Sequence, residues 1–438
     1  MTSIPDAFTG SKLDDLICRF VQGFMHLPLQ RSSEWLAEKS KGVGGSELAI
    51  VDGCNPYQKI PDMVLGKIGL KPFESQAACN WGTLFEDVVT RYIEIDLDTT
   101  VRGTDIWIPG FKRHHVSPDG ICRVTCELRQ NRYTNEYVTV LKSKQPHGVN
   151  EIIYEDTDVL ATCDMASLVE FKCPYRRKPT GIIPKYYVPQ ILAGLVVAPM
   201  TTRGLFVDAA FRKTSIETLT FDRRYDSKYH VEQNNWGQPL ALGIIGFTAT
   251  DTEWIRNLII EYISLRNFSY EDEIYDPLPN TVTPDEIRIT QKVDLVSTHL
   301  PIDLGSCPRE FFDRFLAKFA EKEVGVMFND PCLVCDRFTS PNQLGSLARN
   351  RAEIDRMQVD VWSSNDEAEL VAVLPWKLFQ IYYVQLPRND KFIADLEPKV
   401  ASIMEIVDEI RAVGGLPERA KKFRQHFPNT KIPSFPDI

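Results

Sequence analysis

Three side chains of this 438-residue sequence have the types and spacing to catalyse hydrolysis together. Glu170 and Lys172 lie two residues apart in the alternating stretch 168–174, and the geometry of a strand would place both on one face. Asp119 supplies a second carboxylate from the turn at 117–120. Clustered carboxylates collect Mg²⁺ or Mn²⁺, which polarise a phosphate and lower the pKa of a bound water. The alternative interpretation of 168–174 is an edge strand that shows two charges to water.

Glu86 is a further candidate acid. It lies in the segment 81–93, where Leu84, Val88 and Tyr92 would line one side of a helix. Apolar positions flank Glu86, which indicates that its side chain points towards the edge of the core. A carboxylate in such a place must be paired, hydrogen-bonded or bound to a metal ion.

A glycine turn at 42–45 leads into a helix whose first turn holds Ser46 and Glu47. Free N–H groups at the start of a helix can hold a phosphate. The alternative is an ordinary capped helix start. The turn is not a Walker loop, because no Gly-Lys-Ser or Gly-Lys-Thr follows it.

The composition is that of a globular protein, with 43% hydrophobic and 25% charged residues, and the length suggests two or three domain-sized units. A net charge of −10 argues against a protein that coats nucleic acid by bulk attraction, but it permits an enzyme with a local basic groove. No run of about 18 apolar residues occurs and no signal peptide is visible, so neither a membrane span nor secretion is expected. Ten cysteines then indicate reduced thiols in an intracellular protein.

The spacing of apolar residues predicts a mixture of helices and strands. Helices are expected at 11–29, 62–70, 81–93, 189–197, 253–266, 308–323, 341–357 and 391–412, with a short one capped by Ser32 or Ser33. Strands are expected at 106–110, 114–117, 138–141, 152–154, 168–174, 205–211, 216–221, 241–249 and 378–386. Residues 121–167 are rich in Arg and Lys and would form either a solvated hairpin or a basic flap. Residues 267–300 are polar and proline-rich, which indicates a linker or a long loop.

Five sequence blocks, taken in this order, resemble the YqaJ-like viral recombinase family. Phage lambda exonuclease and the alkaline-exonuclease-like proteins of large nucleocytoplasmic DNA viruses belong to the same group, within the PD-(D/E)xK nuclease superfamily. The likeness covers residues 30–211. The blocks are Trp35 with 42–47 and 55–57; 81–82 with 85–86; 117–120; 170–174; and Tyr187 with Gln190.

The resemblance implies a role for each matching residue of the catalytic motif. Asp119 and Glu170 would be direct metal ligands, helped by the backbone carbonyl of Phe171. Glu86 would reach a metal directly or through a water. Lys172 would orient and activate the nucleophilic water. The cofactor would be Mg²⁺, with Mn²⁺ as a substitute, and two ions per site are expected.

Other matching residues would contact the substrate. Gln190 would lie at the edge of the site, and Ser46 would bind the terminal or scissile phosphate. The family often has Arg seven residues before Ser46, and this sequence has Lys39 there. A lysine is a point charge rather than a bidentate fork, so Lys41 or Arg31 are alternative anchors. Two more DNA-binding candidates lie in the basic loop after 168–174, namely Arg176 and Arg177.

The implied fold class is α/β: a restriction-endonuclease-like core with a central mixed β-sheet flanked by helices, plus a family-atypical insertion. Residues 1–234 would form the nuclease core and 235–372 an insertion or accessory subdomain. Residues 373–412 would return to the core as a strand and terminal helix, and 413–438 would form a tail. Cys332 and Cys335, with Cys307, could contribute to a zinc site in the insertion, although no clear fourth ligand follows.

The implied function is that of a metal-dependent exonuclease acting 5′→3′ on double-stranded DNA in recombination, repair or replication-intermediate processing. A structure-selective endonuclease would use the same chemistry. A regulatory or interaction protein on a nuclease scaffold is the alternative from another class. Expected partners are double-stranded DNA, a single-strand annealing protein and further copies of the chain, and no membrane. The expected location is intracellular, in the host cytoplasm if the protein is viral.

Overall fold

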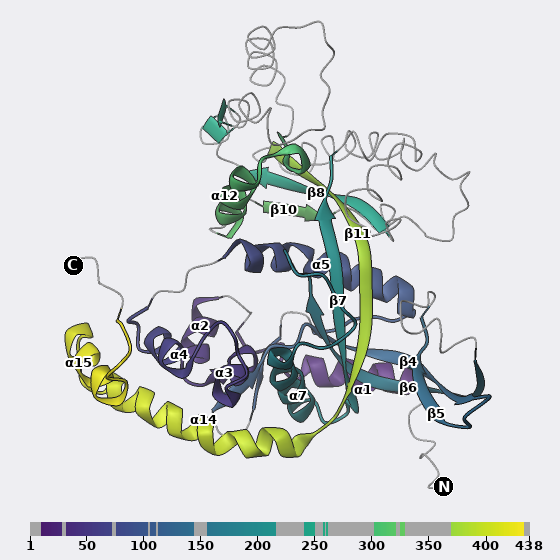
Figure 1. The fold of residues 1–438 in the computed structure, drawn as a ribbon, viewed down its shortest axis with the longest axis horizontal. Coiled ribbons are helices and arrows are strands. Elements are labelled where there is room, and N and C mark those ends of the chain that lie inside the picture. The colour runs from purple at the N-terminus through teal and green to yellow at the C-terminus, as the bar shows by residue number, and fades with distance from the viewer. Residues whose placement is uncertain are drawn as a thin grey trace, which may run out of the picture.

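Figure 1 shows the computed structural model of the chain. The described residues are 10–28, 32–71, 76–103, 106–110, 113–143, 156–215, 241–249, 257–258, 260–261, 302–320, 325–328 and 369–432. Several predicted features lie outside them: the elements at 152–154, 216–221, 267–300, 341–357 and most of 253–266, and the side chains of Arg31, Cys332 and Cys335.

A mixed β-sheet forms the centre of the fold. Strand β4 (Gly120–Asn131) runs antiparallel to both β5 (Tyr137–Leu141) and β6 (Thr157–Lys172). Strand β6 runs parallel to β7 (Arg203–Lys213), and helix α7 (Val188–Val197) makes the crossover between them. The order of these four strands is β7-β6-β4-β5, and further strands continue the sheet beyond β7. The prediction of a central mixed sheet flanked by helices is confirmed.

Strand β6 is much longer than the sequence predicts. It begins at Thr157, whereas the alternating pattern begins only at Leu168. The early part of β6 is fixed by its pairing with β4, from Asn131 opposite Thr157 to Arg123 opposite Ala166. Residues 158–162 are exposed, so no apolar alternation marks them in the sequence.

Helices cover both faces of the sheet, because alternate strand residues point to opposite sides. Val169 and Phe171 of β6 pack with helix α5 (Ala77–Leu97), whereas Ala166 and Leu168 pack into the hydrophobic cluster on the other face. Helix α7 packs on that second face, together with α1 (Ser11–Gln22), α3 (Leu48–Asp52), α4 (Ile60–Lys67), α14 (Asp390–Arg411) and α15 (Leu416–His426).

Part of the predicted insertion extends the central sheet. Strand β8 (Ala241–Ala249) pairs with β11 (Glu369–Pro387), which pairs in turn with β7. Strand β10 (Gly325–Phe328) pairs with β8, and β9 (Ile302–Asp303) pairs with β11. Helix α12 (Arg309–Ala320) packs on α5. β11 crosses the predicted boundary at residue 372, and the domain boundaries stay predictions.

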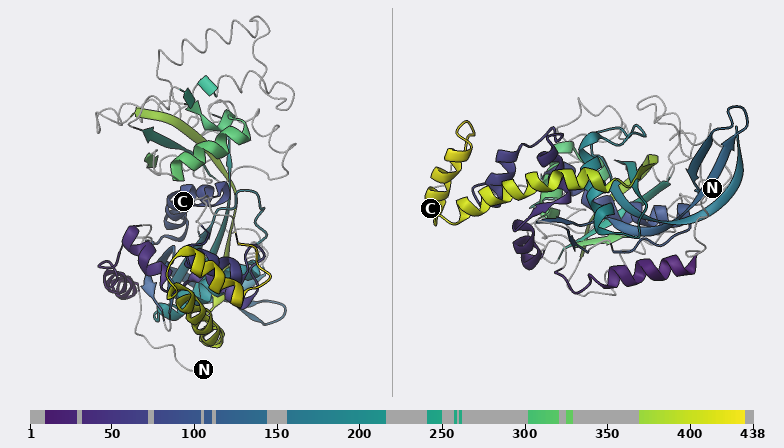
Figure 2. Two further views of the ribbon diagram at one scale, coloured as in Figure 1. Left: turned by 90° about the vertical axis from the view of Figure 1, so that its left-hand side faces the viewer. Right: turned by 90° about the horizontal axis from the view of Figure 1, so that it is seen from below.

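Figures 1 and 2 place β8 and α12 at one end of the molecule and α14 with α15 at the other. Helix α15 lies within the stretch that the sequence suggests as a tail. None of the described helices has the combination of length and apolar character that a membrane span needs.

A small second sheet sits beside the N-terminal helices. Its strands are β1 (Val43–Gly44), β2 (Ile108–Pro109) and β3 (His114–Val116), in the order β1-β3-β2. Helix α2 (Ser33–Ser40) precedes it, and the Ser32 hydroxyl accepts a hydrogen bond from the Trp35 N–H at 3.1 Å. This cap confirms one of the two predicted cap residues.

Candidate active site

The predicted acids and the lysine meet at one end of the central sheet. Glu170 and Lys172 lie in the last three residues of β6. Asp119 directly precedes β4, whose first residue, Gly120, lies opposite Val169 of β6. The site is therefore outside the carboxyl end of the parallel strand β6, where open α/β sheets bind their ligands.

Asp119 contacts the backbone between Glu170 and Lys172, and these two residues contact each other. The Phe171 N–H donates a hydrogen bond to Asp119 Oδ2 at 2.6 Å. Glu170 is 1% exposed, and the Lys172 ammonium forms a close ion pair with Glu170 Oε1. Such a partner is required, because a buried carboxylate without one would carry a large desolvation penalty.

The charges of the site are not balanced by the lysine alone. Burial and the charge of Asp119 raise the pKa of Glu170 well above its ordinary value, with a smaller contribution from Glu86. Burial lowers the pKa of Lys172, but the charges of Glu170 and Asp119 outweigh burial and raise it. Excess negative charge of this kind attracts a cation.

Glu86 joins the cluster from helix α5. It is half-buried, and its charge acts on both Glu170 and Cys173. The neighbouring Phe85 stacks on Phe211 of β7 with ring centroids 4.3 Å apart, which holds this part of α5 against the sheet. Burial raises the pKa of the Cys173 thiol well above its ordinary value, so this cysteine is neutral and packs in the core.

The donor atoms of the cluster suit a divalent cation that prefers oxygen. Glu86, Asp119 and Glu170 carry carboxylates, and Phe171, the residue after Glu170, carries a backbone carbonyl. Both are ligand types of Mg²⁺ and Mn²⁺. The Lys172 ammonium provides the positive charge beside Glu170. Among the described residues, no group of three or more His, Cys, Asp or Glu side chains is arranged closely enough to hold a metal ion without a shift of side chains.

Gln190 and Tyr187 connect the cluster to the glycine turn. The Lys172 Nζ lies 5.0 Å from the ring centroid of Tyr187, at the end of the short helix η2 (Lys185–Tyr187). Gln190 lies in the first turn of α7, and its Cγ would be 3.6 Å from a Cβ placed on Gly45. The structure therefore brings the predicted edge residue and the predicted phosphate turn together.

Two of the predicted phosphate contacts lie at that turn. Ser46 is exposed in the middle of the short helix η1 (Gly45–Glu47). Lys39 lies beside the glycine turn: its Cε would be 3.9 Å from a Cβ placed on Gly44. The Lys39 ammonium is 4.7 Å from the ring centroid of Trp35, a residue of the same sequence block.

The other predicted DNA-binding side chains differ in exposure and in whether they pair with an acidic residue. Lys41 is exposed and forms an ion pair within its own helical segment. Arg176 is exposed in the loop after β6. Arg177, in contrast, donates two hydrogen bonds to the carboxylate of Asp208, at 2.6 and 2.8 Å, so its guanidinium is already engaged.

Asp208 is a residue of the site that the sequence interpretation missed. It lies opposite Lys172 in the parallel pairing of β6 and β7 and is 1% exposed. Burial raises the pKa of Asp208, and the Arg177 guanidinium partly offsets this effect. The sequence does contain a signal for this residue: Asp208 is a single acid inside the apolar strand 205–211. Burial of an unpaired charge there would cost free energy, so a basic partner is expected.

Known proteins share sequence with the part of the chain that carries this cluster. Residues 34–202 match the model of the YqaJ-like viral recombinase domain. A protein of African swine fever virus (isolate Tick/Malawi/Lil 20-1/1983) is 36% identical over 236 residues, which are 53% of this chain and 64% of the relative's length. The match thus spans less than two thirds of that viral relative. Protein YqaJ of Bacillus subtilis (strain 168) is 41% identical over 71 residues, 16% of this chain and 22% of that protein.

Among solved structures, an alkaline exonuclease (LHK-Exo) from Laribacter hongkongensis aligns with 41% of this chain and 74% of its own, at 17% identity and a TM-score of 0.27. That likeness is too low to carry an argument, so the description of the fold depends on the pairing of this chain's own strands. The sequence match spans all five motif blocks up to Gln190. Residues 34–202 of the chain are similar in sequence to the YqaJ-like viral recombinase domain.

Proposed function

We propose that this protein is a metal-dependent DNA exonuclease of the PD-(D/E)xK type that degrades double-stranded DNA from its 5′ ends. The observation that carries the proposal is the convergence of Glu86, Asp119, Glu170 and Lys172 at one end of the sheet. Metal-dependent hydrolysis of a phosphodiester can use oxygen ligands to hold the ions and a nitrogen base to place the attacking water.

The carboxylates of Glu86, Asp119 and Glu170 and the Phe171 carbonyl would hold Mg²⁺ or Mn²⁺, two ions at full occupancy. When bound, the ions would polarise the phosphate and stabilise the leaving oxygen. The hydrogen bond from the Phe171 N–H keeps Asp119 beside Glu170, which sets the spacing of these ligands.

Lys172 would place the attacking water. Its ammonium is held between Glu170 and the Tyr187 ring, so its position is restricted on two sides. Beside bound cations, Lys172 would have a lowered pKa, and its Nζ would accept a proton from the attacking water. Gln190 would support the substrate from the start of α7.

A viral recombinase domain and a relative encoded by a DNA virus support a role in recombination, repair or the processing of replication intermediates. In that setting the exonuclease would generate single strands for an annealing protein. The proposed place of action is the site of viral replication in the host cytoplasm. Association with further copies of the chain is also part of the proposal.

The test uses purified protein, Mg²⁺ and a linear duplex that carries its label at one 5′ end or one 3′ end. A covalently closed circular duplex runs in parallel. The proposal predicts early release of label from the 5′ end and an intact circle. Early release from the 3′ end would refute the polarity, and cleavage of the circle would replace the proposal with an endonuclease.

A further inference from the structure

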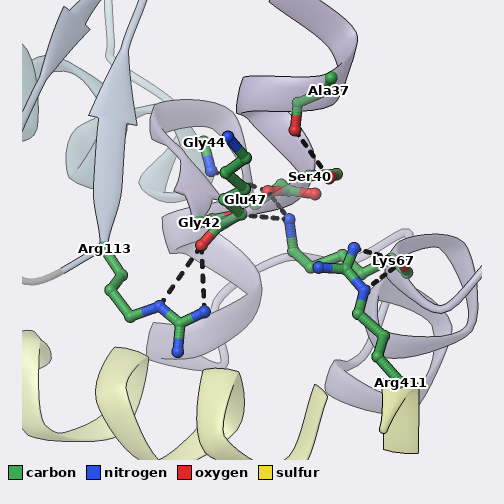
Figure 3. Close-up of polar contacts among 9 residues, drawn as sticks. Ala37, Ser40, Gly42, Gly44, Glu47, Lys67, Arg113 and Arg411 are labelled. Atoms are coloured by element: carbon green, nitrogen blue, oxygen red, sulfur yellow. Dashed lines mark hydrogen bonds and ion pairs between the residues drawn. The ribbon is translucent and has the colours of Figure 1, made fainter. Parts of the chain in front are cut away.

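The glycine turn at 42–47 is held in shape by a charge pair from another helix. The Glu47 Oε2 accepts hydrogen bonds from the Gly44 N–H at 2.7 Å and from the Lys67 ammonium at 2.8 Å. The same ammonium donates to the Gly42 carbonyl at 2.7 Å. Figure 3 shows Lys67 reaching from α4 towards Gly42 and Glu47. Lys67 therefore joins the two ends of the turn through a single nitrogen.

This ion pair is shielded from water. The Lys67 side chain is 6% exposed and that of Glu47 is 23% exposed. A charge pair removed from water is weakly screened by salt, and its geometry is fixed by the directions of its hydrogen bonds. Loss of either partner would leave the other charge without compensation. The conformation of the turn thus depends on both residues.

The C-terminal helices fix Lys67 in turn. The Lys67 carbonyl accepts hydrogen bonds from Arg411 at 2.6 and 3.2 Å, and the Ile68 carbonyl accepts one from Arg419 at 3.2 Å. These arginines of α14 and α15 satisfy carbonyls at the C-terminal end of α4 that have no partner within the helix. Position 67 is thereby tied to a part of the chain more than 340 residues away.

A second link joins the turn to α14. The Arg113 guanidinium donates to the Lys41 carbonyl at 3.3 and 3.4 Å and to both carboxylate oxygens of Asp408 at 2.5 and 3.1 Å. The Val43 N–H donates to the Arg113 carbonyl at 2.8 Å. The residues on either side of Gly42 are therefore held by Arg113, which directly precedes β3, while Lys67 of α4 holds Gly42 itself (Figure 3).

The part of the turn that these contacts hold in place includes the residue that would bind a phosphate. Ser46 is exposed between the two fixed ends of the turn, with Gln190 behind Gly45. The His115 ring lies behind Gly44, where its Nε2 would be 3.4 Å from a Cβ. His115 is only 5% exposed. Its Nε2 is buried and has no hydrogen-bond partner among the described residues. A buried nitrogen without a partner calls for an explanation, and a water or a ligand group bound at the turn would supply one.

We propose that Lys67, acting through Glu47, is a positioning residue that holds the 42–47 turn in the conformation that binds the terminal 5′-phosphate of the DNA substrate. This inference rests on the proposed exonuclease function. Lys67 would not touch the DNA, because both acceptors that it faces belong to the turn itself. Its effect would appear in how the enzyme distinguishes a 5′-phosphate from a 5′-hydroxyl.

The test compares Lys67→Ala with Lys71→Ala, a matched control four residues later whose ammonium forms a looser ion pair with Asp62 at 3.6 Å. Binding of a 5′-phosphorylated and a 5′-hydroxyl duplex is measured by fluorescence anisotropy in EDTA, where no cleavage occurs. The intact protein is expected to prefer the phosphorylated duplex by about tenfold, which corresponds to one charge-assisted contact. Lys67→Ala should lose this preference, and Lys71→Ala should keep it.

Two further variants separate positioning from a loss of folding. Lys67→Arg should restore part of the preference, and Glu47→Gln should weaken it while keeping an acceptor for the Gly44 N–H. With Mg²⁺, Lys67→Ala should raise KM for the phosphorylated duplex about tenfold and leave kcat within about threefold. An unchanged preference in a folded Lys67→Ala protein would overturn the inference. A fall in kcat on both duplexes would also overturn it, because that result assigns the turn to the scissile phosphate.

The binding arm keeps this inference distinct from the proposed function. If the intact protein cleaves no DNA but the phosphate preference depends on Lys67, the exonuclease proposal fails and the role of Lys67 in the turn stands. If the intact protein cleaves DNA without any preference for a 5′-phosphate, the exonuclease proposal stands and the inference fails.

Discussion

The N–H of Phe171 donates a hydrogen bond to Asp119 Oδ2 over 2.6 Å, so the turn before β4 and the end of β6 are joined at the residue between Glu170 and Lys172. Oδ2 of Asp119 thereby fixes the backbone of β6 between Glu170 and Lys172. The proposed function assigns the same carboxylate a second task, the binding of a cation.

Replacing Asp119 by Asn tests this double role. The variant keeps an oxygen that can accept from the Phe171 N–H, but it loses the negative charge. We expect the fold to survive and nuclease activity in Mg²⁺ to fall at least about a hundredfold, because several kcal/mol of charge stabilisation are lost. Circular dichroism checks the fold and single-turnover cleavage checks the activity. An Asp119→Asn protein with full activity would contradict the assignment of this carboxylate.

The affinity for the metal should rise with pH. The pKa of Glu170 is raised by burial and by the charge of Asp119, so in the metal-free protein this carboxyl tends to hold a proton. A cation must displace that proton, and the affinity therefore increases as the proton is lost, by up to about tenfold per pH unit. Calorimetric titration with Mn²⁺ from pH 6 to pH 9 measures this dependence. Glu170→Gln should bind weakly at every pH, and a flat profile for the unaltered protein would contradict the prediction.

Two adjacent arginines should behave differently. Arg177 forms a fork on the buried carboxylate of Asp208, whereas Arg176 is exposed. Arg177→Ala leaves Asp208 buried without a partner and should lower the free energy of unfolding by about 3 kcal/mol. Arg176→Ala should change it by less than about 0.5 kcal/mol. Urea unfolding of both variants measures this difference. Equal midpoints would show that the ion pair of Arg177 with Asp208 adds no stability.

A pair of glycines tests the packing of the phosphate turn. A Cβ at Gly42 would lie 2.4 Å from the Arg113 carbonyl oxygen, a backbone atom that cannot turn aside. Gly42→Ala should therefore lower the free energy of unfolding by about 1–3 kcal/mol. At Gly66, inside α4, a Cβ meets nothing within 4 Å, and Gly66→Ala should be neutral or stabilise by up to about 1 kcal/mol. Thermal unfolding compares the two, and a stable Gly42→Ala protein would show that the turn is looser than its contacts indicate.

The sequence is most informative where short motifs carry the chemistry. Asp119, Glu170 and Lys172 were predicted from residue types, spacing and family likeness, and the structure brings them together with Glu86. Their roles stay predictions until activity is measured. The match over residues 34–202 confirms the family likeness of this region.

Contacts between distant segments could not be predicted in this way. The fork from Arg177 to Asp208 follows from the parallel pairing of β6 with β7, and the early part of β6 follows from its pairing with β4. The bond from Arg411 to the Lys67 carbonyl spans 344 positions of sequence. No local periodicity encodes such pairings, because each depends on how complete elements pack.

The most direct test of the central claim is single-turnover nucleotide release from a linear duplex in Mg²⁺ by three proteins. These are the unaltered chain, Lys172→Ala, and Lys391→Ala, which removes an exposed lysine of α14 paired with Asp395. We predict equal rates for the unaltered chain and Lys391→Ala, and a rate at least about a hundredfold lower for Lys172→Ala. Absence of cleavage by the unaltered chain with either Mg²⁺ or Mn²⁺, or full activity of Lys172→Ala, would contradict the account and favour a regulatory protein on a nuclease scaffold.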